Sequence, residues 1–539
     1  MHIRSLLVWL CAALTPVVRL TAQTNVLTYH NDLARTGQNL AETILTPSNV
    51  NSSTFGKLFL TTLDGLVDAQ PLYVSGLSLP NQGTHNVLIA ATENDSVYAL
   101  DADSGATLWH TSLLRSGETP SDNRGCSQVT PVIGVTSTPV IVFKSASAGG
   151  IIYAVAMSKD ASSHYHQRLH ALSLTTGREL LGGPVNIQAR FPGTGETSSG
   201  GYVFFDPAQY KERSGLLLLN GEIYLGWASH CDDQPYTGWI MAYNASTLAQ
   251  TAVLNVTPNG SEGAIWGAGG GFAADSSENI YFLDANGTFD TTLTAQGFPV
   301  NGDFGNAFIK LVTTGGQISV TDYFTMYNTV SESDADEDLG SGGAMVLPDM
   351  TDASGNVQHL AIGAGKDGNI YVVNRDNMGK FNPNNNKSVY QELSGALAGG
   401  IWSNPAYYMG NVYYGAVNNS IRAFKFSQAL LGSTPASMTS HQFPYPGVTP
   451  SISANGATNG ILWAVENTSP AVLHAYLATN LATQLYNTNQ APNGRDQFGN
   501  GNKFMTPTIV NGKVYVGTPT GVAAFGLLAT GSSTSEGRR

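Results

Sequence analysis

The chain has 539 residues, of which 60 are glycine, 23 are tyrosine and only 12% are charged. Its formal net charge of -13 provides no basic surface that would attract phosphates, so the composition argues against a nucleic-acid-binding protein. It contains no long stretch with the Ala, Leu and Lys content of a helical protein. We therefore expect a large β protein with few helices.

The N-terminus has the pattern of an export signal. Arg4 precedes an apolar run from Leu6 to Val18, and Ala22 is a small residue suited to cleavage. We predict a signal peptide over residues 1–22 and a mature protein that is secreted or periplasmic, in the cell envelope. The apolar run is shorter than the ~20 residues that span a bilayer, so no membrane span is expected after cleavage.

After cleavage two cysteines would remain, Cys126 and Cys231. An oxidising compartment would allow them to form one disulfide between two loops, and the sequence alone leaves this open. Residues 23–54 precede the repeats described next. We expect this extension, with His30 and Arg35, to pack on the repeat domain.

A pentapeptide, Val97–Asp101, recurs with altered spelling along the whole chain. Its first, third and fourth positions are mostly apolar or small, as in a strand buried on its inner face. The seven further copies are Leu169–Ser173, Ile240–Asn244, Phe308–Val312, Ile370–Asn374, Ile421–Lys425, Leu473–Leu477 and Val522–Gly526.

Each copy follows a second segment rich in Tyr and β-branched residues, and a turn usually separates the two, which indicates β-hairpins. The copies are spaced by roughly 70 residues early in the chain and roughly 50 later, as in propeller blades with loop insertions. We predict an all-β fold, a single eight-bladed β-propeller over residues 55–528, followed by a disordered tail over 529–539. The division of Gly263–Phe324 between blades stays open.

The segment Val97–Trp109 resembles the repeat of the pyrroloquinoline quinone (PQQ) dehydrogenase-like propellers. The resemblance implies that an N-terminal strand completes the last blade, and Lys57–Thr61 is placed to pair with Val522–Leu527. Enzymes of this superfamily hold the quinone on the propeller axis with calcium, a tryptophan floor, a pair of adjacent cysteines and a catalytic aspartate.

Several segments are similar to those that carry these elements. The resemblance implies cofactor contacts at Arg124 and Trp266, calcium ligands at Asn286 and Asp233, and a catalytic base at Asp336 or Asp338. The chain departs from the family in two respects, because it has no adjacent cysteines and no second tryptophan after Gly269–Gly271.

Two clusters could bind metal ions on their own. Asp334, Asp336 and Asp338 alternate like the first oxygen ligands of a calcium loop, although the run does not match an EF-hand. A solvated acidic loop tip is the alternative. His164, His166 and His170 could bind a transition metal if they share one face of a strand, or they are exposed loop histidines.

We interpret the chain as an exported, non-catalytic and monomeric propeller that binds a protein or glycan partner through its long early loops, with no cofactor expected. The alternative is a divergent PQQ- and calcium-dependent quinoprotein oxidoreductase acting on an alcohol or sugar. It would use Asp338 or Asp336 as base, with Asn286 and Asp233 at calcium. Geometry distinguishes the two, because an active site requires these side chains to converge on the axis beside an aromatic plane.

Overall fold

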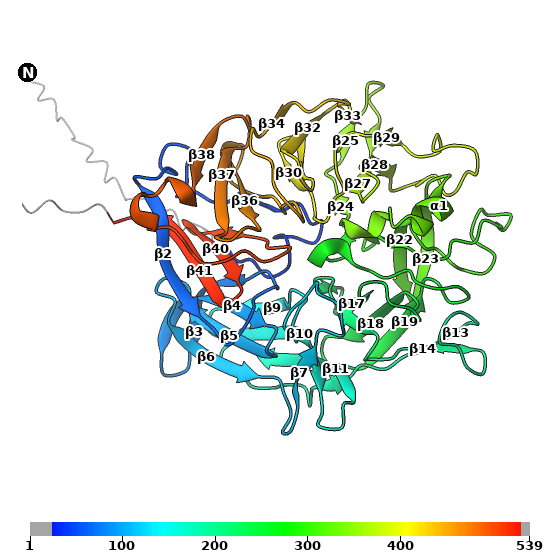
Figure 1. Ribbon diagram of the computed structural model, residues 1–539, viewed down its shortest axis with the longest axis horizontal. Coiled ribbons are helices and arrows are strands. Elements are labelled where there is room, and N and C mark those ends of the chain that lie inside the picture. The colour runs from blue at the N-terminus through cyan, green and yellow to red at the C-terminus, as the bar shows by residue number, and fades with distance from the viewer. Residues whose placement is uncertain (1–23, 530–539) are drawn as a thin grey trace, which may run out of the picture.

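The computed structural model describes residues 24–529, and eight main antiparallel sheets stand in a ring around a central axis (Figure 1). This confirms the eight-bladed β-propeller. All eight predicted pentapeptides form strands, and each is the third strand of its blade. The predicted signal peptide and residues 530–539 of the predicted tail lie outside the described residues.

The first four blades carry the long insertions. Blade 1 consists of β3 (Leu72–Leu79), β4 (Gly83–Thr92), β5 (Ser96–Asp101) and β6 (Thr107–Ser112). Blade 2 consists of β9 (Val140–Ser145), β10 (Gly149–Lys159), β11 (Tyr165–Ser173) and β12 (Val185–Asn186), with β7 (Thr119–Asp122) and β8 (Val132–Ile133) added. Blade 3 consists of β16 (Leu217–Leu219), β17 (Glu222–Ser229), β18 (Trp239–Asn244) and β19 (Gln250–Asn255), with β15 (Tyr210–Glu212) added to β17. Blade 4, whose strands were ambiguous in the sequence, consists of β20 (Ala273–Ala274), β21 (Ile280–Leu283), β22 (Phe308–Thr314) and β23 (Gln317–Phe324).

The last four blades are more compact. Blade 5 consists of β24 (Met345–Val346), β27 (Leu360–Ala364), β28 (Ile370–Asn374) and β29 (Gln391–Leu393). Blade 6 consists of β30 (Ala406–Tyr408), β31 (Asn411–Gly415), β32 (Ile421–Ser427), β33 (Leu430–Leu431) and β34 (Ser437–Met438). Blade 7 consists of β35 (Ser451–Asn455), β36 (Thr458–Glu466), β37 (Val472–Leu477) and β38 (Gln484–Asn487), and blade 8 begins with β39 (Thr508–Val510), β40 (Lys513–Thr518) and β41 (Gly521–Leu527). Two separate hairpins pair β13 (Arg190–Pro192) with β14 (Tyr202–Phe204) and β25 (Met350–Thr351) with β26 (Val357–Gln358).

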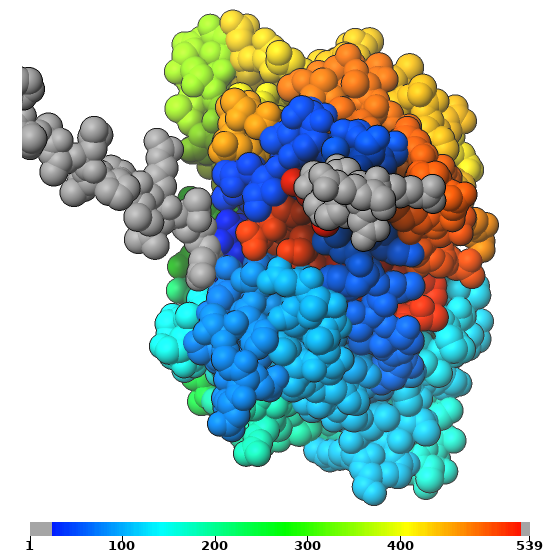
Figure 2. All heavy atoms as spheres, turned by 90° about the vertical axis from the view of Figure 1, so that its left-hand side faces the viewer, coloured from blue at the N-terminus to red at the C-terminus, as the bar shows by residue number. Residues whose placement is uncertain are grey.

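An N-terminal strand closes the ring. β2 (Phe55–Thr62) pairs antiparallel with β41 as the fourth strand of blade 8, and Lys57 lies opposite Phe525. Figure 2 shows the blue N-terminal residues beside the red C-terminal ones on the surface. The closure implied by the family resemblance is therefore confirmed, and it ties the two ends of the domain together.

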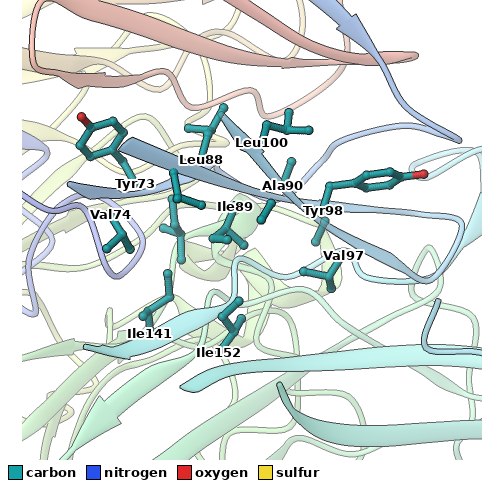
Figure 3. Close-up of a cluster of buried hydrophobic side chains, with 14 of the residues drawn as sticks. Tyr73, Val74, Leu88, Ile89, Ala90, Val97, Tyr98, Leu100, Ile141 and Ile152 are labelled. Atoms are coloured by element: carbon teal, nitrogen blue, oxygen red, sulfur yellow. The ribbon is translucent and has the colours of Figure 1, made fainter. Parts of the chain in front are cut away.

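Apolar side chains fill the space between neighbouring blades. In Figure 3, Ile89 and Val97 of blade 1 face Ile141 and Ile152 of blade 2, and each of these side chains is at most 3% exposed. Successive strand residues point to opposite faces, so a β-branched residue at every second position lines one such interface. Burial of these surfaces holds the blades against one another.

Helical structure is scarce among the described residues, as expected. They contain one α-helix, α1 (Thr329–Asp334), and four 3-10 turns, η1 (Gly267–Gly269), η2 (Leu339–Ser341), η3 (Thr488–Gln490) and η4 (Pro492–Gly494). None of the helices in this part of the chain is long and apolar enough to cross a bilayer. Asp334, the first residue of the acidic series Asp334, Asp336 and Asp338 that we expected in a loop, is the last residue of α1. Glu332, in the same helical turn, is buried.

The N-terminal extension packs on the propeller at its axis. Residues 26–39 hydrogen-bond to the start of the innermost strand, or the residue before it, in every blade. The partners are Tyr73, Ile141, Leu216, Ala274, Val346, Tyr407, Ile452 and Ile509 in blades 1 to 8. Gln38–Asn39, which form β1, continue this contact as a strand parallel to β35. The segment therefore plugs the centre of the ring.

Arg35 is the centre of this plug and is fully buried. Its guanidinium donates to the carbonyl oxygens of Tyr29 at 2.7 Å, Phe272 at 2.9 Å and Leu216 at 3.3 Å. Burial lowers the pKa of Arg35 to about 10, which still leaves the group charged at neutral pH. Carbonyl groups from two blades and from the plug itself thus share one buried cation.

Replacing Arg35 tests the importance of the plug. We expect Arg35→Met to lower the free energy of unfolding by about 3–5 kcal/mol, because several buried carbonyl groups lose their donor together. Chemical denaturation followed by tryptophan fluorescence measures the change. Arg178→Met, at an exposed position, is the control and should stay within about 0.5 kcal/mol of the parent. Equal effects of the two variants would contradict the role assigned to Arg35.

Candidate functional site

A small polar pocket lies on the axis, where segments of several blades meet. Its walls come from residues that precede the innermost strands and from the hairpins between second and third strands. The lining residues are Gln128, Arg213, Asp232, Trp266, Ala268, Asp338, Ser341, Lys366, Trp402 and Phe504. The cavity volume of about 30 Å³ gives room for one or two water molecules.

The acidic side of the pocket is organised around Lys366, which lies in the hairpin between β27 and β28. Its Nζ is 2.7 Å from Oδ1 of Asp338 and also pairs with Asp336. Asn286 donates from Nδ2 to Oδ1 of Asp336 at 2.7 Å. The structure thus brings together three of the predicted site residues, Asn286, Asp336 and Asp338. The cation that pairs with the two carboxylates is the ammonium group of Lys366.

Asp338 is 1% exposed, and neither of its carboxylate oxygens has a hydrogen bond of acceptable geometry. The short ion pair with Lys366 is therefore the main interaction that offsets the cost of burying the Asp338 carboxylate. Burial raises the pKa of Asp338, and the charge of Lys366 opposes this shift. Burial lowers the pKa of Lys366, but Asp338 and Asp336 more than offset this and hold it above its usual value. A buried carboxyl with a raised pKa is well suited to accept a proton.

The other side of the pocket combines cations with aromatic rings. Arg213, 2% exposed, lies 4.6 Å above the ring of Phe504 and 3.7 Å from the carboxylate of Asp68. The Nζ of Lys211 lies 4.6 Å from the centre of the Trp266 ring. Burial, followed by the charge of Arg213, lowers the pKa of Lys211 to about 7. This side of the pocket suits an anionic, planar ligand.

A disulfide joins Cys126 and Cys231 at the edge of the pocket, with a Cα–Cα distance of 5.6 Å. Gln128 and Asp232, which line the pocket, lie within two residues of these cysteines. The bond therefore fastens the β7–β8 connection of blade 2 to the β17–β18 hairpin of blade 3. Nearby, Arg124 lies outside the pocket lining and donates to Tyr165 Oη at 2.8 Å.

Other predicted residues lie elsewhere. Asp233 is exposed, and its neighbour Asp232 lines the pocket instead. Asp334 is exposed at the end of α1. His164 and His166 approach Asp160, at 3.1 and 3.4 Å, whereas His170 pairs with Glu179 at 2.9 Å. The three histidines therefore do not form one cluster.

Sequence reasoning missed Arg213, Lys366, Trp402 and Phe504. Lys366 belongs to the glycine-rich segment Gly363–Gly368, which reads as an ordinary blade turn. Only the position of that hairpin beside the axis gives the lysine its role. A rule that singles out charged residues in the hairpin between the second and third strand of each repeat would have found Lys366 and Asp232.

No protein-family model and no curated protein sequence matches the chain. Solved structures match its fold. A quinohemoprotein alcohol dehydrogenase from Comamonas testosteroni aligns with a TM-score of 0.63 and 13% identity, over 96% of this chain and 82% of that one. A second quinohemoprotein alcohol dehydrogenase, from Pseudomonas putida HK5, aligns with a TM-score of 0.60 and 14% identity over 96% of this chain and 82% of that one. A europium-containing methanol dehydrogenase aligns with a TM-score of 0.61 and 13% identity over 95% of this chain and 99% of that one. The chain has the propeller fold of the PQQ-type dehydrogenases, which confirms the resemblance seen in its repeat.

The pair formed by Lys366 and Asp338 provides a test of the pocket's electrostatics. We expect Lys366→Met to lower the free energy of unfolding at pH 7 by about 3 kcal/mol, because it leaves a buried carboxylate unpaired. The loss should shrink as the pH falls and Asp338 becomes protonated. Denaturant titrations over a range of pH measure this.

A surface pair is the matched control. Lys513 Nζ lies 2.6 Å from Asp103 Oδ1, with side chains 18% and 51% exposed, so Lys513→Met should cost less than about 1 kcal/mol. A loss for Lys366→Met no larger than that of the control would contradict the buried ion pair.

Proposed function

We propose that the axial pocket is the active site of a divergent quinoprotein oxidoreductase that oxidises an alcohol or a sugar. The observation that supports the proposal is that a carboxyl group, two cationic groups and an aromatic ring converge in one pocket. Asp338, with its raised pKa, lies in the same pocket as Lys366, Arg213 and the ring of Trp266. Of the residues that the sequence suggested as base or calcium ligands, Asp338 lines this pocket beside Trp266. Asp336 joins it through Lys366, Asn286 joins it through Asp336, and Asp233 does not take part. The fold shared with PQQ-type dehydrogenases supports it.

The donor set fits PQQ and a hard cation. PQQ is planar and anionic, and Arg213 has an unpartnered buried Nη2, while Trp266 and Trp402 offer ring faces. Asn286 has an unpartnered buried Oδ1 that, with the oxygens of Asp338, suits calcium. The cavity of about 30 Å³ is too small for a tricyclic ring, so the pocket would have to widen to admit it.

A bound quinone would supply a two-electron acceptor, and calcium would polarise it. The chain's own residues would hold and orient the reactants. Asp338 would accept the hydroxyl proton of the substrate, and Lys366 would stabilise the aspartate before that transfer. Lys366 and Arg213 would balance the charge of the anionic group. Export by the predicted signal peptide would place the reaction outside the cytoplasm.

Titration with PQQ tests this function. We expect the metal-stripped chain to bind PQQ only when calcium is added, as measured by calorimetry, and the loaded protein to oxidise alcohols or sugars with an artificial dye acceptor. Asp338→Asn, measured at calcium and PQQ concentrations that saturate the variant, should lose activity by about 10²–10⁴-fold, because it removes the base.

Asp352→Asn is the control, because its carboxylate bonds only within the β25–β26 hairpin, and it should leave activity unchanged. A folded parent chain that binds no PQQ with calcium present would refute the proposal.

The sequence favoured a propeller that binds a protein or glycan partner, and one observation supports glycan binding as a second candidate. A groove of about 740 Å³ lies beside α1 and the outer part of blade 5. Its lining combines tyrosine rings with amide and carboxylate groups, the mixture that suits sugar rings and hydroxyls: Tyr327, Asn328, Glu332, Asn369, Tyr371, Asn384, Asn385, Asn386, Tyr390, Gln391 and Glu392. Tyr327 is 50% exposed, which leaves its ring available to a ligand.

An array of immobilised glycans tests this candidate. We expect the parent chain to bind a subset of the glycans and Tyr327→Ala to lose at least about tenfold in affinity, as for loss of an aromatic contact. Tyr202→Ala, on β14 and outside the groove, is the control and should bind as the parent does. Binding that survives Tyr327→Ala would exclude this groove.

A further inference from the structure

Two histidines and a glutamate meet at the junction of blades 6 and 7. His441 lies in the connection that leads from β34 to β35, Glu466 ends β36, and His474 is the third residue of β37. Sequence analysis did not single out these residues, which are spread over 34 positions of the chain. Among the described residues they form the one group of three or more His, Cys, Asp or Glu whose ligand atoms lie within 4.8 Å of one another.

Both imidazoles approach one oxygen of Glu466. Nε2 of His441 lies 3.0 Å from Oε2 of Glu466, and Nε2 of His474 lies 2.9 Å from the same oxygen. The two imidazole rings stack with centroids 5.0 Å apart and planes 27° apart. Tetrahedral zinc with bonds of about 2.0–2.1 Å places its ligand atoms about 3.4 Å apart, so each nitrogen would have to move a few tenths of an ångström away from this oxygen to admit the ion.

The surrounding residues hold this arrangement in place. The buried ring of Phe443 meets both imidazoles edge-on, at 4.9 Å from His441 and 5.2 Å from His474. Gln484 Nε2 lies 3.1 Å from Nδ1 of His474 and donates to it, while Tyr476 Oη lies 3.3 Å from the same nitrogen. Once Nε2 became a ligand, Nδ1 would carry the proton, and Tyr476 Oη is the acceptor that could hold the ring in place.

Hairpin register places the other two ligands side by side. His474 lies opposite Ala464, so Glu466, two residues further along β36, is a diagonal neighbour on the same face of the sheet. The side chains of His474 and Glu466 are 4% and 9% exposed, whereas His441 is 41% exposed. Two ligands are thus buried, and the third leaves one side of the site open to solvent.

We propose that His441, Glu466 and His474 form a site for one divalent transition-metal ion of the zinc type, with water in the fourth position. Two imidazoles and one carboxylate are a ligand set that binds zinc in proteins. The ion would join the connection that follows blade 6 to two strands of blade 7 and so fasten these blades together. The site lies apart from the axial pocket, whose lining includes none of the three residues.

Without metal, the same geometry is satisfied by two Nε2–H groups that donate to one carboxylate oxygen. The two states make different predictions. A hydrogen-bonded triad would leave zinc unbound, whereas zinc binding would move the proton of each neutral imidazole from Nε2 to Nδ1 as the Nε2 atoms become ligands. Zinc titration therefore separates them directly.

Calorimetric titration of the tag-free, chelator-treated full chain with ZnCl₂ is the experiment. We expect one equivalent of zinc to bind, and thermal unfolding to shift upward with zinc concentration. Cobalt in place of zinc should give the visible absorption of a four- or five-coordinate ion. His441→Ala, at the partly exposed ligand, should weaken zinc binding by at least about 100-fold, since a ligand is lost.

Two further variants complete the design. Glu466→Gln keeps the shape and the hydrogen bonds of the side chain but removes its charge, so a folded variant with weak zinc binding separates ligation from folding. The double variant His164→Ala, His166→Ala removes the other histidine pair and should bind zinc as the parent does. Absence of zinc binding by the parent, or unchanged affinity in His441→Ala, would overturn the proposal. Neither outcome depends on PQQ.

Discussion

The structure depends on the contacts that residues 26–39 make at the centre of the ring. Eight sheets converge there, and their innermost strands present backbone groups that no further strand of the same sheet can pair. The N-terminal segment provides partners in all eight blades, and Arg35 satisfies carbonyl groups of two blades and of its own segment. With β2 completing blade 8, the same stretch of chain both closes the ring and fills its axis.

The plug also determines where chemistry can occur. It lies along the starts of the innermost strands, so the space left on the axis is bounded by the residues that precede these strands and by the inner hairpins. Asp338, Arg213 and Lys211 are buried there with few partners, which costs stability. Groups that are expensive to bury and that converge on one pocket are more easily explained by a ligand or a reaction than by folding.

The two proposed cation sites differ in chemistry. The axial pocket offers carboxylate and amide oxygens beside the ammonium of Lys366, and such oxygens would suit a hard ion such as calcium. The site at blades 6 and 7 offers two imidazoles and suits zinc. The two sites can therefore be loaded and tested separately in one protein.

The sequence by itself determined the strands and the number of blades. These follow from a local pattern, alternation along short β-branched segments, which repeats eight times and is independent of distant residues. The family resemblance implied the closure of the ring by an N-terminal strand and brought Trp266, Asn286, Asp336 and Asp338 into view. Only the tertiary structure decided that Asp232 rather than Asp233 faces the pocket, that Lys366 pairs with Asp338, and that His441 meets His474. Such contacts join separate segments of the chain, and their distances depend on how these segments are packed around the axis. The role of Arg35 could not be predicted from the sequence for the same reason, because its side chain is buried only once the ring has closed around it.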